Sequence, residues 1–120
     1  MAKRILFVDD EPDVLRVATF RLKKAGYEVI NTIDGQEALS LLRKERFDLI
    51  FLDLRLPVMN GMEICSIIKA DEEIKSTPVI LFTESHRDLE QKIRDCGAQG
   101  YLLKPFEPEQ LLDKVKNIIG

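Results

Sequence analysis

The chain has 120 residues, which is the size of one ordinary domain and large enough to bury roughly two-thirds of the surface that its unfolded form exposes. Its composition, 45% hydrophobic and 32% charged, supports a proper core under a polar surface. The net charge of −3 excludes a global positive field that would draw the chain to nucleic acid or an anionic membrane, and no apolar stretch approaches the roughly 20 residues that cross a bilayer.

Five apolar runs recur along the chain with the length and continuous apolar character of inner strands. They are Ile5–Val8, Val29–Ile33, Leu49–Leu52, Val79–Phe82 and Tyr101–Leu103. The segments between and after these runs carry apolar residues at helical spacing. The residues at that spacing are Val14, Ala18 and Leu22, then Ala38, Leu39 and Leu42, then Cys65 and Ile68, then Leu89, Ile93 and Cys96, and finally Leu111, Val115 and Ile118. We therefore expect five strand–helix repeats that form a single domain over residues 1–120.

Helix boundaries are marked by capping residues. Asp34 and Asn60 each stand three residues before a glutamate, which is the spacing of a capping box. Proline is tolerated in a first helical turn, and glycine often adopts the left-handed conformation that ends a helix. The residues in those two roles are Pro12, Pro108, Gly26 and Gly97.

Strands that alternate with helices predict an α/β fold in which a parallel sheet is covered on both faces. In such a doubly wound sheet, ligands bind outside the carboxyl ends of the strands, near the point where the strand order reverses. The residues that directly follow the strands are therefore the first candidates for chemistry.

Three aspartates stand where two inner strands end: Asp9 and Asp10 after the first strand, and Asp53 after the third. Like charges held together repel, and a fold keeps them close only if a positive group joins them or one carboxyl stays protonated. Mg²⁺ takes oxygen ligands and needs only one or two carboxylates. The cluster therefore predicts a site for a hard divalent cation.

Polar residues also end the fourth and fifth strands, where Thr83 follows Phe82 and Lys104 follows Leu103. The second strand ends in Thr32-Ile33-Asp34 and offers nothing comparable, which suits a strand at the edge of the sheet. A single aspartate after a strand is usually a helix cap or a solvated loop residue. Four strand ends that carry an acid pair, an acid, a hydroxyl and an ammonium instead indicate one shared pocket.

Four motifs carry a resemblance to a known family. They are Val8–Glu11, Leu52–Gly61, Phe82–Thr83 and Lys104–Phe106, in this order along the chain. Over its whole length the chain resembles the receiver domain of bacterial two-component response regulators. The resemblance implies a flavodoxin-like fold, in which a five-stranded parallel sheet of strand order 2-1-3-4-5 is flanked by five helices.

The resemblance also implies roles for the acids. Asp53 would accept a phosphoryl group from the phosphohistidine of a sensor histidine kinase or a histidine phosphotransfer protein. Asp10 and Asp53 would bind Mg²⁺ directly, together with the backbone carbonyl of Arg55, and Asp9 would hold a metal-bound water. Mn²⁺ is expected to substitute. Carboxylates are weak nucleophiles, so the site would have to supply position and charge neutralisation.

The same resemblance implies a switch. Lys104, aimed by a cis bond to Pro105, would pair with one phosphoryl oxygen, and Thr83 would donate its hydroxyl to another. The movement of Thr83 would leave space for Tyr101 to rotate inward and change the partner-binding surface of the fourth helix, fifth strand and fifth helix. The alternative for Tyr101 is a half-exposed aromatic on an edge strand.

Two residues at the expected rim of the pocket depart from the family pattern. Arg55 stands two residues after Asp53, and Glu84 directly follows Thr83 at a position that is usually small in this family. An acid and a base on opposite lips predict an ion pair across the entrance that tunes access of the donor, water or a phosphatase. The alternative is two unrelated solvated charges, because exposed pairs contribute only about 0–1 kcal/mol.

Two other functions share parts of this pattern. A flavodoxin-like carrier of flavin mononucleotide needs a Gly/Ser/Thr-rich loop after the first strand to cradle a phosphate, whereas the acids from Asp9 to Asp13 would repel one. A Mg²⁺-dependent aspartyl-phosphate hydrolase generally has a second acid two residues after its nucleophile, where this chain has Arg55. We therefore expect a signalling domain rather than an enzyme, one that assists its own phosphotransfer and autodephosphorylation.

The remaining features indicate surroundings and partners. Cys65 and Cys96 are too few for a disulfide scaffold or a zinc site and predict buried thiols in a reducing cytoplasm. His86 is expected to be a solvated loop residue. The last residues, Asn117–Gly120, show no start of a linker, which favours a stand-alone regulator with a protein target over the receiver of a longer protein with an effector domain. This domain is expected to bind neither nucleic acid nor a membrane directly.

Overall fold

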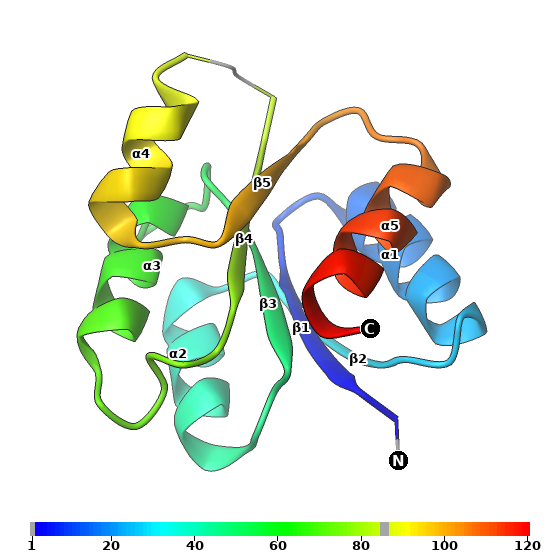
Figure 1. Ribbon diagram of the computed structural model, residues 1–120, viewed down its shortest axis with the longest axis horizontal. Helices are drawn as coiled ribbons and strands as arrows, with labels where there is room; N and C mark the ends of the chain where they lie inside the picture. The colour runs from blue at the N-terminus through cyan, green and yellow to red at the C-terminus, as the bar shows by residue number, and fades with distance from the viewer. Residues whose placement is uncertain (1, 85–86) are drawn as a thin grey trace.

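Strands and helices alternate along the chain, as the spacing of its apolar residues predicts. The computed structural model describes residues 2–84 and 87–120, and these form five strands and five helices (Figure 1). The strands are β1 (Arg4–Val8), β2 (Glu28–Thr32), β3 (Leu49–Asp53), β4 (Val79–Thr83) and β5 (Gly100–Leu103). The helices are α1 (Pro12–Lys24), α2 (Gly35–Lys44), α3 (Gly61–Ala70), α4 (Leu89–Cys96) and α5 (Pro108–Ile119). Every predicted strand is confirmed to within one residue at each end. His86, which was expected to be a solvated loop residue, lies outside the described residues.

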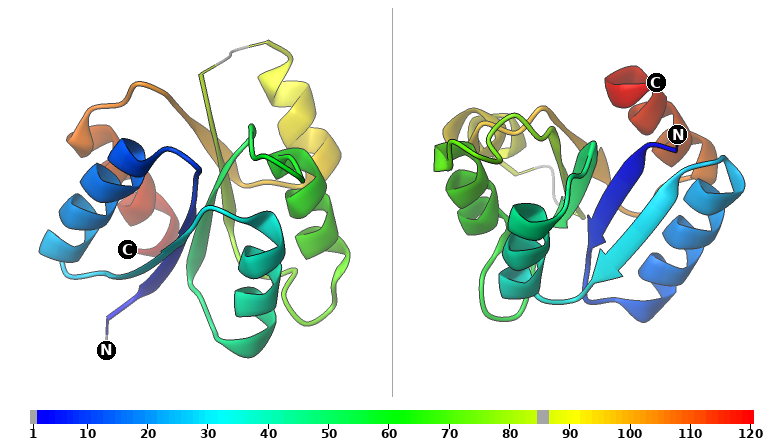
Figure 2. Two further views of the ribbon diagram at one scale, coloured as in Figure 1. Left: turned by 180° about the vertical axis from the view of Figure 1, so that it is seen from behind. Right: turned by 90° about the horizontal axis from the view of Figure 1, so that it is seen from below.

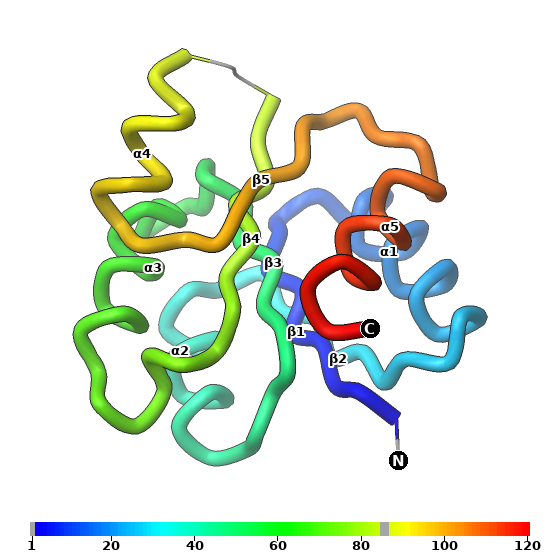
Figure 3. The backbone as a smooth tube through the Cα atoms, in the orientation of Figure 1, coloured from blue at the N-terminus to red at the C-terminus, as the bar shows by residue number. Residues whose placement is uncertain are grey.

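The described strands form a parallel sheet in the order β2-β1-β3-β4-β5, which confirms the expected order. In register, Val8 lies beside Leu52, Leu52 beside Leu81, and Thr83 beside Leu103. The strands β1, β3, β4 and β5 therefore end at the same edge of the sheet, and the backbone tube can be followed to this edge (Figure 3). This edge carries the residues that the sequence assigns to chemistry.

Helices cover both faces of the sheet. The helices α1 and α5 lie on one face, and α2, α3 and α4 lie on the other (Figures 1 and 2). The central strands β1, β3 and β4 are buried almost throughout, which explains their continuous apolar sequences, whereas the edge strands β2 and β5 have exposed positions. Within the described ranges, none of the helices combines the length and the apolar character needed to span a membrane.

Aromatic rings support the central strands from the face that α1 and α5 cover. The ring centroids of Phe7 and Phe51 lie 5.1 Å apart, and those of Phe7 and Phe82 lie 5.5 Å apart. Phe106, which follows β5, packs on Phe82 at 5.1 Å. Burying one such side chain stabilises a fold by roughly 1.5–3 kcal/mol. The strand ends are therefore held in place by rings packed beneath them.

Helix ends follow the predicted signals, with one correction. The side chains of Asp34 and Asn60 each accept a hydrogen bond from the first turn of their helix at 2.9 Å. Neither shows the reciprocal bond of a capping box within the described part of the chain. A full capping box instead starts α5, where Glu107 and Gln110 cap each other. At the end of α4, Gly97 adopts the predicted left-handed conformation with φ 82°.

Candidate functional site

Polar side chains from four strand ends meet at one cavity on the carboxyl edge of the sheet. The cavity has a volume of about 260 Å³. Its lining residues are Asp10, Glu11, Asp53, Arg55, Thr83, Glu84 and Lys104. Asp9 is wholly buried and contacts one of these lining residues, because its Oδ2 lies 2.8 Å from Lys104 Nζ. The structure thus brings together the predicted acids, the hydroxyl, the ammonium and both rim residues.

Backbone contacts hold Asp53, which is the last residue of β3 and only 4% exposed. Its Oδ1 accepts a hydrogen bond from the Arg55 N–H at 3.0 Å, which ties the carboxylate to the turn after the strand. Gly61 packs on this turn so closely that a Cβ there would overlap the Asp53 carbonyl. The Gly61 N–H also donates to the Leu54 carbonyl at 3.1 Å. The nucleophile candidate is therefore placed by backbone rather than by side chains that could shift.

The three aspartates form a compact group of oxygen ligands. One carboxylate oxygen from each of Asp9, Asp10 and Asp53 lies within 4.8 Å of the others. Asp9 Oδ1 accepts a hydrogen bond from the Glu11 N–H at 2.9 Å, but Asp9 Oδ2 accepts no hydrogen bond of good geometry from the residues that the structure describes. The Lys104 ammonium lies 2.8 Å from this oxygen and compensates its charge, and a carboxylate oxygen has a second lone pair that a hard cation or its bound water would use. The donor set therefore fits Mg²⁺.

Lys104 supplies positive charge to the same acids. Its Nζ lies 2.8 Å from Asp9 Oδ2, 2.8 Å from Glu11 Oε1 and 3.3 Å from Asp53 Oδ2, and its side chain is 7% exposed. The peptide bond to Pro105 is cis, as the resemblance implies. The acids therefore do not depend on a divalent cation alone for charge balance, because the ammonium neutralises part of their charge.

Glu11 is a lining residue that was not singled out as a site residue. It directly precedes Pro12 and occupies the N-cap position of α1. Serine, threonine, asparagine and aspartate are preferred at that position, but Glu107 caps α5 from the same position, so the sequence alone did not distinguish a site role for Glu11 from a capping role.

Burial and charge together shift the pKa values of the two central groups. Burial raises the pKa of the Asp53 carboxyl to about 6. The Arg55 N–H and the Lys104 ammonium oppose this rise, and the Asp9 carboxylate adds to it. For Lys104, burial lowers the pKa, but the pairing with Asp9, Glu11 and Asp53 outweighs burial and raises it above the ordinary value of 10.5. At neutral pH, Asp53 is therefore mostly ionised and Lys104 is charged.

The rim and the proposed switch residue lie at different places around the site. Arg55 and Glu84 are both exposed at the opening of the cavity. The described residues contain no ion pair between these two side chains, so the structure does not contain the expected bridge across the entrance. Tyr101 lies on β5 outside the cavity lining and is 36% exposed, with Lys114 Nζ 5.7 Å from its ring centroid. This position is compatible with a switch and also with a plain edge-strand aromatic.

The two cysteines are buried and free, as expected. Cys65 Sγ donates to the Cys96 carbonyl at 3.4 Å across the contact between α3 and α4. Burial raises the pKa of the Cys65 thiol, and contact with Cys96 adds to the rise. Because the thiolate is the reactive form, this pair serves packing rather than chemistry.

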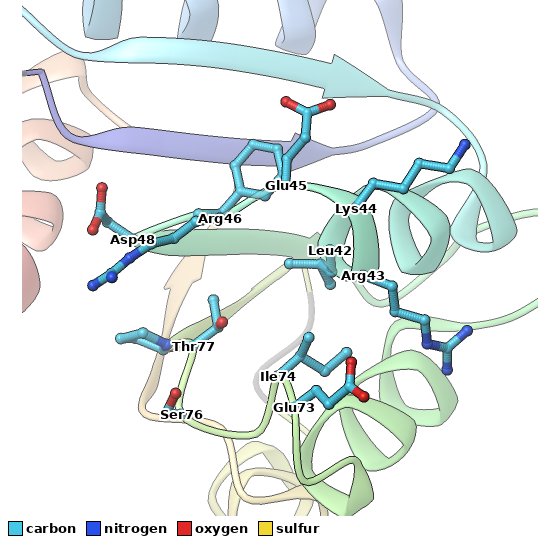
Figure 4. Close-up of a pocket in the computed structure, with 12 residues that line it drawn as sticks. Leu42, Arg43, Lys44, Glu45, Arg46, Asp48, Glu73, Ile74, Ser76 and Thr77 are labelled. Carbon is cyan, nitrogen blue, oxygen red and sulfur yellow. The ribbon is translucent and has the colours of Figure 1, made fainter.

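A second cavity, of about 520 Å³, lies at the opposite edge of the sheet, between the end of α2, the start of β3 and the segment before β4. Charged residues line it, but their side chains do not converge. Figure 4 shows Arg46 pointing away from Arg43 and Lys44, while Glu45 points out of the cavity. This cavity therefore offers no comparable chemistry.

Comparison with known proteins identifies the family. The sequence model of the response regulator receiver domain matches residues 5–116. The chain belongs to this family. The DNA-binding response regulator MtrA of Mycolicibacterium smegmatis is 35% identical to this receiver domain over 117 residues, which are 97% of this chain and 50% of that protein. The receiver domain thus spans about half the length of the curated relatives that it matches.

Solved structures agree with the receiver fold. The chemotaxis response regulator CheY4 of Vibrio cholerae has a TM-score of 0.93 and 35% identity, with 99% of this chain and 100% of that chain covered. The receiver domain of the sensor histidine kinase PA1611 from Pseudomonas aeruginosa has a TM-score of 0.90 and 32% identity, with 100% and 99% covered, and holds a magnesium ion in its active-site cleft. The chain is therefore a receiver domain of two-component signal transduction. These matches favour that interpretation over the aspartyl-phosphate hydrolase and the flavin carrier.

Proposed function

We propose that this receiver accepts a phosphoryl group on Asp53 from the phosphohistidine of a sensor histidine kinase or a histidine phosphotransfer protein. The placement of the Asp53 carboxylate supports this most: it is buried at the cavity, 3.3 Å from the Lys104 ammonium and bonded to the Arg55 N–H. Receiver domains as a family accept phosphate from histidine kinases.

The chemistry of the transfer uses residues that line the cavity. An Asp53 oxygen attacks phosphorus as the bond from phosphorus to the imidazole nitrogen breaks, and the electron pair stays on the imidazole. With a proton on the other ring nitrogen of the phosphohistidine, the products are an acyl phosphate on Asp53 and a neutral histidine on the donor. Lys104 would stabilise charge on one phosphoryl oxygen, and the Thr83 hydroxyl would donate to another. The pKa of about 6 leaves Asp53 ionised for the attack at neutral pH.

Metal binding would involve the acids at the same edge. Asp10, Asp53 and the backbone carbonyl of Arg55 would hold Mg²⁺ directly, and Asp9 would hold it through water. When bound, the ion neutralises charge on the phosphoryl oxygens. Two observations support the fit: the aspartate oxygens lie within 4.8 Å of one another, and Asp9 Oδ2 lacks a hydrogen bond among the described residues. Mn²⁺ shares the preference for oxygen ligands and would substitute.

A switch would pass from Thr83 to Tyr101. Thr83 is buried at the end of β4 and lines the cavity, so its hydroxyl would respond to a phosphoryl group bound there. Thr83 pairs in register with Leu103 of β5, and Tyr101 lies two residues earlier on that strand. Inward rotation of Tyr101 would change the surface of α4, β5 and α5, where a downstream protein or an effector domain would bind.

The setting of the domain is part of the same proposal. Residues 1–120 would act as one receiver unit in the cytoplasm, where it would assist its own phosphorylation and autodephosphorylation without turning over a substrate. The relative MtrA is a DNA-binding regulator about twice as long as the matched region. In a protein of that kind, the effector domain would bind DNA, and the receiver would bind neither nucleic acid nor a membrane.

Incubation with acetyl phosphate and Mg²⁺ tests the phosphorylation site. We expect intact-mass spectrometry to show one slowly lost phosphoryl group on the parent chain and none on Asp53→Asn. The matched control is Asp13→Asn, which removes an exposed aspartate outside the cavity and should be phosphorylated like the parent. Phosphorylation of Asp53→Asn at the parental rate would contradict the proposal. Undiminished phosphorylation of the parent after chelation of the metal would contradict it as well. Steady hydrolysis of a phosphate monoester would instead support a hydrolase.

A further inference from the structure

Glu11 stands at the N-cap of α1 but does not cap the helix. Its backbone is extended, with φ −94° and ψ 112°, and its side chain accepts no hydrogen bond from the first turn. A capping side chain at this position stabilises a helix by about 0.5–2 kcal/mol. The Glu11 carboxylate lies instead 2.8 Å from Lys104 Nζ, which follows β5. This carboxylate is therefore engaged with the site rather than with its own helix.

The backbone of Glu11 is held on both sides. Its N–H donates to Asp9 Oδ1 at 2.9 Å, and its carbonyl accepts from the Leu15 N–H at 3.1 Å. Its side chain is 51% exposed, whereas the side chain of Lys104 is 7% exposed. Glu11 thus covers the solvent side of an ammonium whose other two carboxylate partners are buried.

Three carboxylates surround the ammonium: it donates hydrogen bonds to Glu11 Oε1 and Asp53 Oδ2, and it lies 2.8 Å from Asp9 Oδ2 in an ion pair. A phosphoryl oxygen that binds Lys104 would therefore compete with these carboxylates for it. Asp9 is wholly buried, and Asp53 would itself carry the phosphoryl group. Glu11 is the partner that can withdraw into water, because about half of its side chain is already exposed.

We propose that Glu11 is a positioning residue that competes with the phosphoryl group for Lys104 and so restrains phosphorylation of the site. This inference rests on the proposed function of Asp53. Two effects act in the same direction: Glu11 occupies one N–H of the ammonium, and its negative charge repels an incoming phosphoryl anion. Because the pair is half exposed, removing it should change an affinity only roughly two- to fivefold.

The Glu11→Gln variant removes the charge and keeps the length of the side chain. With Mg²⁺ present, beryllofluoride, a mimic of the phosphoryl group, should bind this variant roughly two- to fivefold more tightly than it binds the parent, in a titration followed by amide NMR signals. The gain should shrink at high salt, because an exposed charge is screened. The matched control is Asp13→Asn: Asp13 pairs with Arg16 at 2.7 Å and not with Lys104, so this variant should bind like the parent.

Glu11→Asp separates competition for Lys104 from a general effect of charge. It keeps the negative charge but shortens the side chain by one methylene, which moves the carboxylate away from the ammonium. Competition for Lys104 predicts a gain in beryllofluoride affinity close to that of Glu11→Gln. General charge repulsion predicts no gain. Urea unfolding of each variant shows whether the fold is intact.

Three outcomes overturn the inference: parental affinity in Glu11→Gln, weaker binding in Glu11→Gln, or a gain in Glu11→Gln that is absent from Glu11→Asp. A parent chain that does not bind beryllofluoride at all is a different result. It refutes the proposed role of Asp53, and the inference about Glu11 fails with it.

Discussion

The Asp53→Asn substitution should stabilise the metal-free receiver at neutral pH, although it removes an ion pair. Burial raises the pKa of Asp53 from 3.8 to about 6, so the ionised carboxylate is less favourable in the folded chain than in the unfolded chain. Asparagine has nearly the same shape as aspartate. Its carbonyl oxygen can keep the hydrogen bond from the Arg55 N–H, which is 3.0 Å long in the parent. Lys104 retains Asp9 and Glu11 as partners, both at 2.8 Å.

The magnitude follows from the pKa of Asp53. One pKa unit corresponds to about 1.36 kcal/mol, so a rise from 3.8 to about 6 costs the folded chain roughly 3 kcal/mol at neutral pH. We expect Asp53→Asn to raise the free energy of unfolding by about 1–3 kcal/mol, since asparagine is an imperfect copy of the protonated acid. An acid with a raised pKa contributes stability that is fully present below pH 3.8 and is lost as the pH rises through about 6. The difference in free energy of unfolding between variant and parent should therefore widen from about pH 4 and level off near about pH 7.

Urea unfolding followed by circular dichroism, with a chelator and across this pH range, measures the gap. The control is Asp13→Asn, whose native side chain is 86% exposed, and it should stay within about 0.5 kcal/mol of the parent. Mg²⁺ should narrow or reverse the gap, because it stabilises the folded parent through Asp53 by mass action. A variant less stable than the parent at neutral pH, with a gap that does not shrink in acid, would show that the Lys104 ion pair outweighs the buried charge.

Three further predictions concern the turn, a metal ligand and the rim. Gly61→Ala should destabilise the fold by roughly 2–4 kcal/mol in urea unfolding, because the new Cβ would overlap the Asp53 carbonyl, which is backbone and cannot rotate away. Asp10→Asn should weaken Mg²⁺ binding roughly tenfold or more in calorimetric titration, yet change stability by less than about 0.5 kcal/mol, because Asp10 is exposed. Arg55→Ala and Glu84→Ala should change the acyl-phosphate lifetime additively within about 0.5 kcal/mol, since the described residues contain no ion pair between them.

Each of these predictions has a control or a contrary outcome. Gly35→Ala is the control for Gly61→Ala, because its Cβ would meet Ile64 Cδ1 at 2.5 Å, the end of a side chain that can shift. An equal loss in both variants would mean that the turn after β3 is not rigid. Parental Mg²⁺ affinity in Asp10→Asn would remove that residue from the ligand set. Non-additive lifetimes at the rim would show that the two side chains interact once the site is phosphorylated.

The location of the site could be predicted because it depends on chain order more than on detail. Apolar runs separated by helical stripes favour a parallel sheet, and parallel strands that share a direction end at one edge. Asp53 and Thr83 turned out to be the last residues of their strands rather than the first residues beyond them. This shift of one residue does not matter, because either placement directs the side chain to the same edge.

The pairing of side chains inside the site could not be predicted in the same way, because it depends on differences of a few ångströms. Lys104 could reach several carboxylates, and its contact with Glu11 depends on the direction in which α1 leaves β1. Arg55 and Glu84 do flank the opening, yet they do not pair. Two long side chains in water lose rotational freedom on pairing, and the weak attraction does not compensate for that loss.

Several carboxylates around one ammonium explain why the metal and Lys104 should act together. The acids are Asp9, Asp10, Glu11 and Asp53. A phosphoryl group adds about −1.5 to −2 charges, and Lys104 alone cannot balance these in addition to the acids. A bound cation would neutralise the aspartates and make the ammonium available to the anion. We therefore expect no beryllofluoride binding without a divalent ion at concentrations that saturate the Mg²⁺-loaded receiver, and equal NMR titrations in both conditions would contradict this division of roles.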